Sequence, residues 1–361
     1  MRGNQGEQDE PGPAIHIKRI PDAKYVSVQL FLVANGIPAG FDRCGARHMH
    51  EHLLAVGTDG KLDLELEAAG LSLTANTLRE ATRFEIFGPS DQWQLAIKRI
   101  AALLAPRQWS DADIAAERKT LSEERALLGP DSFALDAAWR AINPDSVDPF
   151  GTPEGWNLLT ASHINLLHRA LTQSQRIVIT VCGDVDVQAC ASFLDAEIKL
   201  APGNSEWGLP ELNLPTPQNG NKNFIAMAQG KWGTADAAAR LSAARALVSA
   251  SRQCSLRYTV SANGGIIACL APDQSALKSA LEIVESDPDG WAAVGIASAK
   301  SWINRSLKAP SAYGYLSGLL LCGNRLADAQ IMVSALAKID AVTVSNLLQR
   351  AAEMGPGGTL K

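Results

Sequence analysis

Apolar and polar residues follow strand-like patterns in several short segments of the first half of the chain. Residues 25–35 (YVSVQLFLVAN) are rich in β-branched and aromatic side chains and partly alternate, which predicts a strand. Residues 14–20 predict a neighbouring strand, so we expect the chain to begin with an antiparallel pair. Residues 81–87 predict a further strand, and the short apolar run at 177–182 predicts a buried one.

Longer segments without glycine or proline predict helices between these strands. They are residues 46–56, 62–69, 93–104 and 187–200. A further helix is predicted to begin after Ser110, because serine often caps a helix N-terminus, and to end at Gly129 and Pro130. Acidic residues in its first turn suit the positive end of the helix dipole.

The order of predicted elements begins again after a segment rich in proline, glycine and asparagine. Residues 202–223 carry four prolines and little periodicity, which is typical of a linker. Beyond it the predicted elements are, in order, a strand at 224–228, a helix at 235–250, strands at 257–260 and 266–271, and further helices. We therefore expect two domains of similar plan, residues 1–201 and a shorter domain of residues 224–361.

Length and charge exclude several classes of protein. With 361 residues the chain is long enough for about two domains, each with its own core. It carries 33 Lys and Arg against 38 Asp and Glu, a net charge of −5, so no basic field favours nucleic acid. No apolar run approaches the ~18 residues of a membrane span, and residues 1–13 lack the pattern of an export signal. We expect a cytoplasmic protein, or a periplasmic one if a signal was removed ahead of residue 1.

The six cysteines are scattered among apolar residues and include no Cys-x-x-Cys pair. This spacing predicts buried free thiols rather than a disulfide framework or a cysteine metal site.

Three of the six histidines fall in one predicted helix, in the sequence His48-Met49-His50-Glu51-His52. His48 and His52 are one helical turn apart and project to the same side with Glu51 beside them, whereas His50 points away. Two neutral imidazoles and a third protein ligand are typical of a catalytic zinc site, and a carboxylate at the position of Glu51 can take a proton from water. The order His-x-x-Glu-His is the inverted form of the zincin motif.

The predicted helix with the serine cap offers three carboxylates for the third zinc ligand, Glu117, Glu123 and Glu124. Glu117 and Glu124 are two turns apart on one face, so one could bind the metal while the other orients a histidine or the substrate. The alternative is that all three are solvated carboxylates of a surface helix. His163 and His168 lie five residues apart in a leucine-rich segment and do not share a helix face, so we expect structural roles for them.

At these residues the chain resembles the M16 metallopeptidases, the family of pitrilysin, insulinase and the mitochondrial processing peptidase. The matching segments follow the family's order over nearly the whole first domain: CGARHMHEHLLAVGT (44–58), GLSLTANTLREATRFEI (70–86), AAERKTLSEE (115–124), DPFGTPEGW (148–156) and RIVITVCGDVD (176–186). The resemblance implies that His48, His52 and Glu124 bind one zinc ion, that Glu51 is the general base and that Glu117 supports the site. It also implies an α+β fold of two homologous α/β-roll domains, each a mixed or antiparallel sheet flanked by helices, the second shortened.

The resemblance also suggests how substrate is held. In the family an edge strand near the zinc receives the peptide as an added strand, and residues 72–77 are the corresponding stretch. Family members usually have Asn-Ala where this chain has Thr74-Ala75, so a shorter hydroxyl replaces an amide that binds substrate. Arg252 and Tyr258 match an arginine and a tyrosine of the family's later domain, one residue closer together than usual, and could stabilise the oxyanion. The alternative is that neither has a catalytic part.

The sequence therefore predicts a zinc-dependent endopeptidase for extended or unfolded peptides. The chain is about half as long as the largest enzymes of the family that it resembles, which implies a homodimer or a heterodimer with a related subunit. A non-catalytic M16-like subunit that binds peptide or a partner is the alternative, favoured by Thr74 and the short second domain and opposed by the intact His48, Glu51 and His52. A hydrolase of non-peptide amides is a third possibility.

Overall fold

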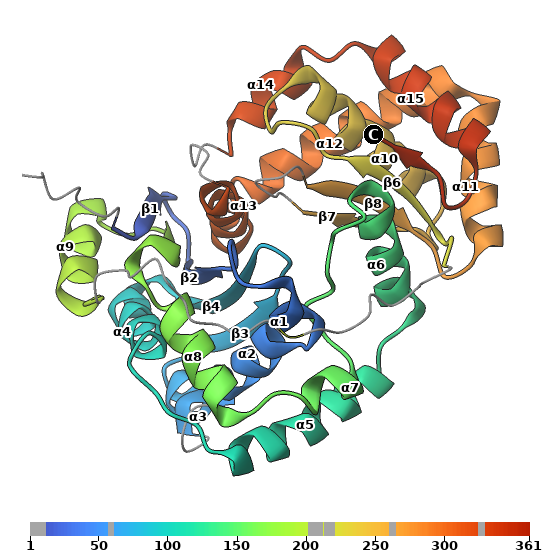
Figure 1. Cartoon of the computed structure of the whole chain (residues 1–361). Helices are drawn as coiled ribbons and strands as arrows, with labels where there is room; N and C mark the ends of the chain where they lie inside the picture. The colour runs from blue at the N-terminus through green and yellow to red at the C-terminus, as the bar shows by residue number, and fades with distance from the viewer. Residues whose placement is uncertain (1–11, 57–60, 201–211, 213–220, 260–264, 324–328) are drawn as a thin grey trace, which may run out of the picture.

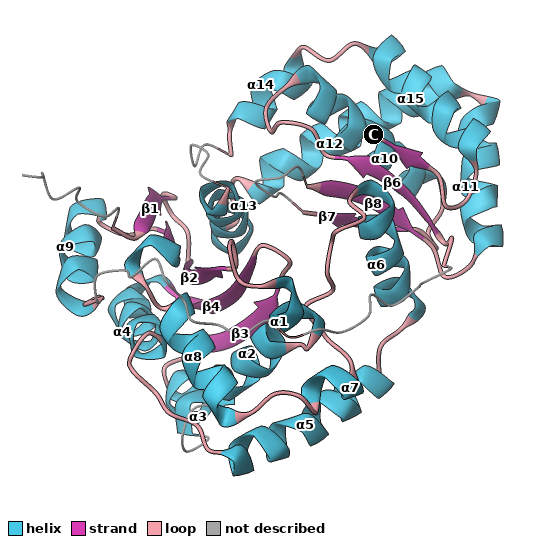
Figure 2. Ribbon diagram, in the orientation of Figure 1, coloured by secondary structure: helices cyan, strands magenta, loops and turns pink. Residues whose placement is uncertain are grey.

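The computed structural model of the chain describes residues 12–56, 61–200, 212, 221–259, 265–323 and 329–361. These residues form two β-sheets, each flanked by helices, in two halves that lie side by side (Figure 1). Helices and strands are mixed throughout both halves (Figure 2). The predicted α+β class with helix-flanked sheets is confirmed.

The first sheet contains five strands in the spatial order β1-β5-β2-β4-β3. They are β1 (Ala14–Arg19), β2 (Tyr25–Val33), β3 (Ser72–Thr77), β4 (Ala81–Pro89) and β5 (Ile177–Gly183). Strand β2 runs antiparallel to both β4 and β5, and β3 runs antiparallel to β4 and forms an edge of the sheet.

The predicted pairing of residues 14–20 with residues 25–35 is wrong. Strand β5 lies between β1 and β2 and runs parallel to β1, with Ile17 opposite Val181. The physical reason is burial. All seven residues of β5 are buried, so β5 takes an interior position, whereas β1 has partly exposed residues and forms the other edge.

The five helices predicted in the first half are present as α2, α3, α4, α5 and α9, with small differences at their ends, whereas α1, α6, α7 and α8 were not among the predicted segments. Ser110 caps its helix as predicted, because its hydroxyl accepts a hydrogen bond from the Asp113 N–H and the Asp113 carboxylate accepts one from the Ser110 N–H. The helices are α1 (Ala39–Arg43), α2 (Ala46–Val56), α3 (Lys61–Ala68), α4 (Trp93–Leu103), α5 (Asp111–Ala126), α6 (Pro130–Ile142), α7 (Pro153–Trp156), α8 (Ala161–Leu171) and α9 (Val187–Glu197), with 3-10 turns at Ser90–Gln92 and Ser174–Arg176.

The second sheet has the order β7-β8-β6-β9, with β9 parallel to β6 and the other pairs antiparallel. Strand β9 was not predicted, and β7 begins two residues before the predicted strand at 257–260, whose last residue lies outside the described residues. Most of the predicted linker at 202–223 also lies outside them, so the domain boundaries stay predictions. The elements are β6 (Phe224–Ala228), α10 (Ala235–Ala250), β7 (Ser255–Tyr258), β8 (Ile266–Leu270), α11 (Gln274–Ser286), α12 (Pro288–Ser306), α13 (Pro310–Cys322), α14 (Ile331–Ala337), α15 (Ala341–Met354) and β9 (Thr359–Leu360).

Each half contributes one helix to the sheet of the other half. Helix α6 packs on β6 and β8, where Ala138 and Trp139 join the buried cluster that contains Phe224 and Leu270. Helix α13 packs on β2 and β5 of the first sheet, as Figure 1 shows beside β2. The exchange joins the two halves through apolar contacts on both sheets.

Glycines let α13 lie close to the first sheet. A Cβ atom on Gly314 would lie 2.8 Å from the Gln29 amide nitrogen, and one on Gly318 would overlap the Phe31 ring. The Gln29 amide donates a hydrogen bond to the Ser311 carbonyl at 2.8 Å, so a buried polar side chain of β2 finds its partner on α13.

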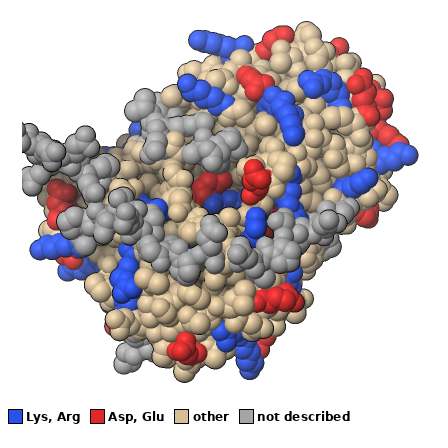
Figure 3. Space-filling model, in the orientation of Figure 1, with Lys and Arg blue, Asp and Glu red and all other residues tan. Residues whose placement is uncertain are grey.

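All six cysteines are free thiols, five of them buried and Cys322 half-buried, as predicted. Within the described residues no single helix is long and apolar enough to cross a membrane, although the pair α14 and α15, bent by 93°, passes the same test of length and composition when taken together. On the face drawn in Figure 3, acidic and basic side chains of the described residues are interspersed.

Candidate metal centre

Helix α2 carries His48, Glu51 and His52, and the first two of these line a cavity. The helix begins after Gly45, whose φ of +72° suits glycine. A Cβ atom at Gly45 would lie 2.6 Å from the carbonyl oxygen of Phe150, so this glycine lets the segment before α7 cross the start of α2. The crossing puts the Phe150 ring against His48, with the ring centroids 4.4 Å apart.

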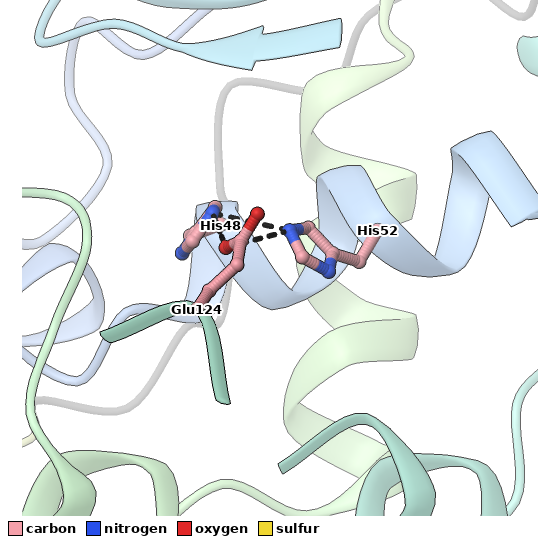
Figure 4. A group of neighbouring side chains, drawn as sticks. All are labelled: His48, His52 and Glu124. Atoms are coloured by element: carbon pink, nitrogen blue, oxygen red, sulfur yellow. Dashed lines mark hydrogen bonds and ion pairs between the residues drawn. The ribbon is translucent and has the colours of Figure 1, made fainter. Parts of the chain in front are cut away.

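Helix α5 supplies the carboxylates, as predicted from its sequence. Glu124 Oε2 lies 3.3 Å from His48 Nε2 and 3.4 Å from His52 Nε2, and the two imidazole nitrogens are 3.2 Å apart. Two turns earlier on α5, Glu117 Oε1 lies 2.7 Å from His52 Nδ1. Figure 4 shows the two rings and the Glu124 carboxylate pointing toward one another from α2 and α5.

These atoms fit a zinc ion. A tetrahedral zinc ion with bonds of about 2.0–2.1 Å holds its ligand atoms about 3.3–3.4 Å apart, and the three separations here are 3.2–3.4 Å. Because a carboxylate only accepts hydrogen bonds, Glu117 fixes the proton of His52 on Nδ1 and leaves Nε2 as a lone pair facing Glu124. The lone pair of His52 Nε2 and the Glu124 carboxylate oxygen repel each other, and a cation bound between them would relieve this repulsion.

Burial and charge set the protonation of the two histidines. Burial, together with the neighbouring His52, lowers the pKa of His48 to about 3, so His48 is neutral and able to bind a metal at neutral pH. Burial also acts to lower the pKa of His52, but the hydrogen bond to Glu117 and the charge of Glu124 outweigh it and raise this pKa. In the metal-free site the surrounding carboxylates therefore favour a positive charge on His52.

Glu51 lies beside this triangle and faces the same cavity. It is 7% exposed, and the Thr77 hydroxyl donates a hydrogen bond of 2.5 Å to its Oε2. Burial raises the pKa of Glu51 to about 7, although the Thr77 hydrogen bond opposes the shift. Thr77 and Phe150 were not predicted as site residues, although both lie in segments that carry the resemblance.

The cavity around these residues has a volume of about 610 Å³. Its wall combines the metal centre with Ala75 and Thr77 of the edge strand β3 and with Leu135 and Trp139 of α6. Among the described residues of the second half, Thr259 lines it. Thr74 lies on the exposed side of β3, because alternate residues of a strand face opposite ways.

Arg252 and Tyr258 lie away from the His48 cavity. Arg252 is exposed between α10 and β7. Tyr258, the last residue of β7, has its ring between those of Trp232 and Trp302, at centroid distances of 5.6 and 5.7 Å. Only its neighbour Thr259 reaches the wall of the metal-centre cavity.

The remaining histidines have structural surroundings. His50 Nε2 lies 3.0 Å from His168 Nδ1 in the buried space on the other side of α2, and His168 Nε2 lies 3.0 Å from the Ala105 carbonyl oxygen. His163 accepts a hydrogen bond from the Thr160 N–H in the capping box of α8. The structural roles expected for His163 and His168 agree with these contacts.

No protein-family model and no curated protein matches the sequence. Solved structures match over almost the whole chain. A candidate M16-like peptidase from Alicyclobacillus acidocaldarius has a TM-score of 0.69 at 16% identity, covering 94% of this chain and 92% of that one. A chain of complex III2 from Candida albicans has a TM-score of 0.67 at 14% identity, covering 93% and 90%. The periplasmic protease PqqL from Escherichia coli has a TM-score of 0.59 at 14% identity, and the match covers 93% of this chain but 44% of PqqL.

At these identities the similarity establishes the fold. Over about 94% of its length the chain has the fold of M16-like peptidases, which agrees with the resemblance in its sequence segments. The matched chain from Candida albicans is part of complex III2.

Proposed function

We propose that this chain is a zinc-dependent endopeptidase that cleaves peptides bound in an extended conformation. The observation that carries the proposal is the triangle of His48, His52 and Glu124 with Glu51 in the same cavity wall. Zinc, when bound there, would supply a Lewis acid that polarises the peptide carbonyl and makes a water molecule more acidic.

Glu51 is placed to move the proton. Thr77 holds one carboxylate oxygen of Glu51, and the other is left for a water molecule in the cavity. Glu51 can take the proton of the attacking water and pass it to the leaving amine. Burial raises the pKa of Glu51 to about 7 in the metal-free site, and a bound cation would lower this pKa, which keeps Glu51 ionised as a base. Glu117 keeps His52 in the tautomer that presents Nε2.

We propose that strand β3 is the binding site of the peptide. It pairs with β4 on one side and is the edge of its sheet in the part of the chain that the structure describes. An extended peptide could therefore add to β3 through main-chain hydrogen bonds, next to Ala75 and Thr77 in the cavity wall. Thr74 offers this peptide a shorter polar group than the asparagine of the family that the sequence resembles.

We also propose that the two halves are copies of one plan, with residues 1–201 and 224–361 as the two domains. The antiparallel order β2-β4-β3 recurs as β6-β8-β7, and each half places a helix on the other's sheet. The second copy is shorter and has no counterpart of β1 in its described part.

The position of Arg252 and Tyr258 supports the proposal of a dimer. They lie away from the metal centre of their own chain, so we propose that a second copy, or a related subunit, supplies such a pair across an interface. The match to PqqL, of which this chain covers 44%, agrees with a chain that corresponds to about half of a larger enzyme.

The test is to measure zinc by elemental analysis, oligomer mass in solution, and cleavage of an unstructured peptide, with small amides as a second substrate. Glu51→Gln should keep zinc bound and abolish peptide cleavage, and Glu123→Gln, an exposed carboxylate on α5, should change neither. If the purified protein binds no zinc and cleaves no peptide, the proposed endopeptidase activity is refuted.

A non-catalytic subunit is the second candidate, favoured by the match to a chain of complex III2 and by Thr74. It predicts a protein that binds peptide or a partner equally well with and without Glu51→Gln, and that shows no hydrolysis when zinc is present.

A further inference from the structure

A second cavity, of about 480 Å³, lies between β7, α10, α12 and α13. Its wall includes Arg245 of α10, Arg257 and Tyr258 of β7, Trp302 of α12 and Tyr315 of α13. At the end of β7, Tyr258 lines this cavity and the next residue, Thr259, lines the cavity of the metal centre.

Arg245 is a half-buried cation, and no carboxylate of the described residues forms an ion pair with it. Its guanidinium carbon lies 4.9 Å from the centroid of the Trp302 ring. Its Nε is buried and has no hydrogen-bond partner among the described residues. Burial lowers the pKa of Arg245 to about 10, which leaves it charged at neutral pH. Removing a charge from water without a partner costs free energy, and an anion bound beside it would offset that cost.

The charges around Arg245 are mainly positive. Arg257 is half-exposed and lies 3.8 Å from Asp131, and Arg305 lies close enough to lower the pKa of Arg245 further. Among the described residues that line this cavity there is no Asp or Glu. The cavity therefore favours an anion, and its aromatic walls favour one attached to an apolar or planar group.

The cavity also lies beside the proposed binding site of the peptide. The Arg83 guanidinium of β4 lies 5.1 Å from the centroid of the Tyr315 ring, and Arg83 Nη1 donates a hydrogen bond to Asn76 Oδ1 of β3 at 3.2 Å. Arg83 is neutralised by Glu85 at 2.5 Å, so it adds no net charge. Tyr315 thus connects the second cavity to the edge of the first sheet.

We propose that this cavity binds a carboxylate of the peptide substrate, either an acidic side chain or the free C-terminal carboxylate, through Arg245 and Arg257. The planar guanidinium matches a carboxylate in two parallel hydrogen bonds, and the rings of Trp302 and Tyr315 cover the neighbouring peptide atoms. The inference rests on the proposed function, because only a peptide on β3 passes this cavity.

The test measures binding in the Glu51→Gln chain with EDTA present, so that it does not depend on hydrolysis or zinc. The probes are octapeptides of neutral residues that carry an uncharged BODIPY dye: one with a C-terminal amide, one with a free C-terminal carboxylate, and a set with a single Asp at each position. Fluorescence anisotropy gives each Kd. The variants are Arg245→Gln, Arg245→Lys and, as a matched control, Arg350→Gln, an exposed arginine of α15.

We expect at least one carboxylate peptide to bind about tenfold more tightly than the neutral amide peptide, and Arg245→Gln to remove that preference. Arg245→Lys should keep part of it, and Arg350→Gln all of it. The peptide that shows the preference distinguishes a side-chain carboxylate from a C-terminal one.

Equal binding of all peptides to the protein would overturn the proposal. So would an equal loss of affinity for neutral and acidic peptides in Arg245→Gln, which indicates a purely structural arginine, or binding of inorganic phosphate without a preference among peptides. If the preference is found but the zinc-loaded wild-type chain cleaves no peptide, the proposed endopeptidase activity is refuted and the proposed carboxylate site is still supported.

Discussion

Replacing Glu51 by glutamine should stabilise the metal-free protein at neutral pH relative to wild type. Glu51 is 7% exposed, and burial raises its pKa from an ordinary 4.5 to about 7. The folded state therefore binds this proton more tightly than the unfolded state, and the stability of the metal-free wild type falls as the pH rises from 4.5 to about 7. Glutamine keeps the acceptor for Thr77 and does not titrate.

The magnitude follows from the two pKa values. They differ by about 2.5, and each pKa unit corresponds to about 1.4 kcal/mol, so ionising Glu51 in the folded state costs about 3 kcal/mol. Below pH 4.5, where Glu51 is protonated in both states, we expect Glu51→Gln and wild type to have similar free energies of unfolding. Above pH 7 the variant should have gained about 3 kcal/mol in its free energy of unfolding relative to wild type.

The assay is urea unfolding followed by far-UV circular dichroism in EDTA, at several pH values between 4 and 8. Adding zinc should shrink the difference, because a divalent cation beside Glu51 favours its ionised form. Glu123→Gln, whose carboxylate is exposed beside Lys119, should show no comparable pH dependence. A difference between wild type and Glu51→Gln that does not grow with pH would refute the reasoning, because Glu51 would then be solvated in the folded state.

Three further changes test the site and the packing. Glu117→Gln should lower zinc affinity roughly 10- to 100-fold, measured by competition with a chromophoric chelator, because His52 loses its charged partner; an effect no larger than that of Glu123→Gln would contradict this role. Thr74→Asn should lower the KM for an extended peptide without changing zinc content, and an unchanged KM would place the peptide elsewhere. Gly318→Ala should lower the free energy of unfolding by about 1–3 kcal/mol in urea titration, because the added methyl group overlaps a ring of the first sheet; a stability equal to wild type would show that α13 has room to move.

The metal centre was accessible from the sequence because its histidines and Glu51 lie within five residues of a helix, where spacing alone decides which side chains meet. Spacing did not distinguish Glu117 from Glu124 as the third ligand. That assignment came from resemblance, and the structure now places Glu124 against both rings. Thr77 reaches Glu51 from an edge strand, so its contribution depends on how β3 lies against α2 and has no periodicity to reveal it.

The exchange of helices was not predictable because it depends on contacts between segments far apart in the sequence. In β2, Ser27 and Gln29 alternate with buried valines, a pattern typical of a strand with one solvated face. That face is covered by α13, whose carbonyl at Ser311 satisfies Gln29. The same exchange builds both cavities, because α6 lines the cavity of the metal centre and α13 lines the cavity that contains Arg245. In each case the lining helix is one that packs on the sheet of the other half, so its position depends on contacts between the two halves. We therefore expect a chain cut within residues 202–223 to retain function only if its two parts associate, which co-purification of separately expressed parts would measure.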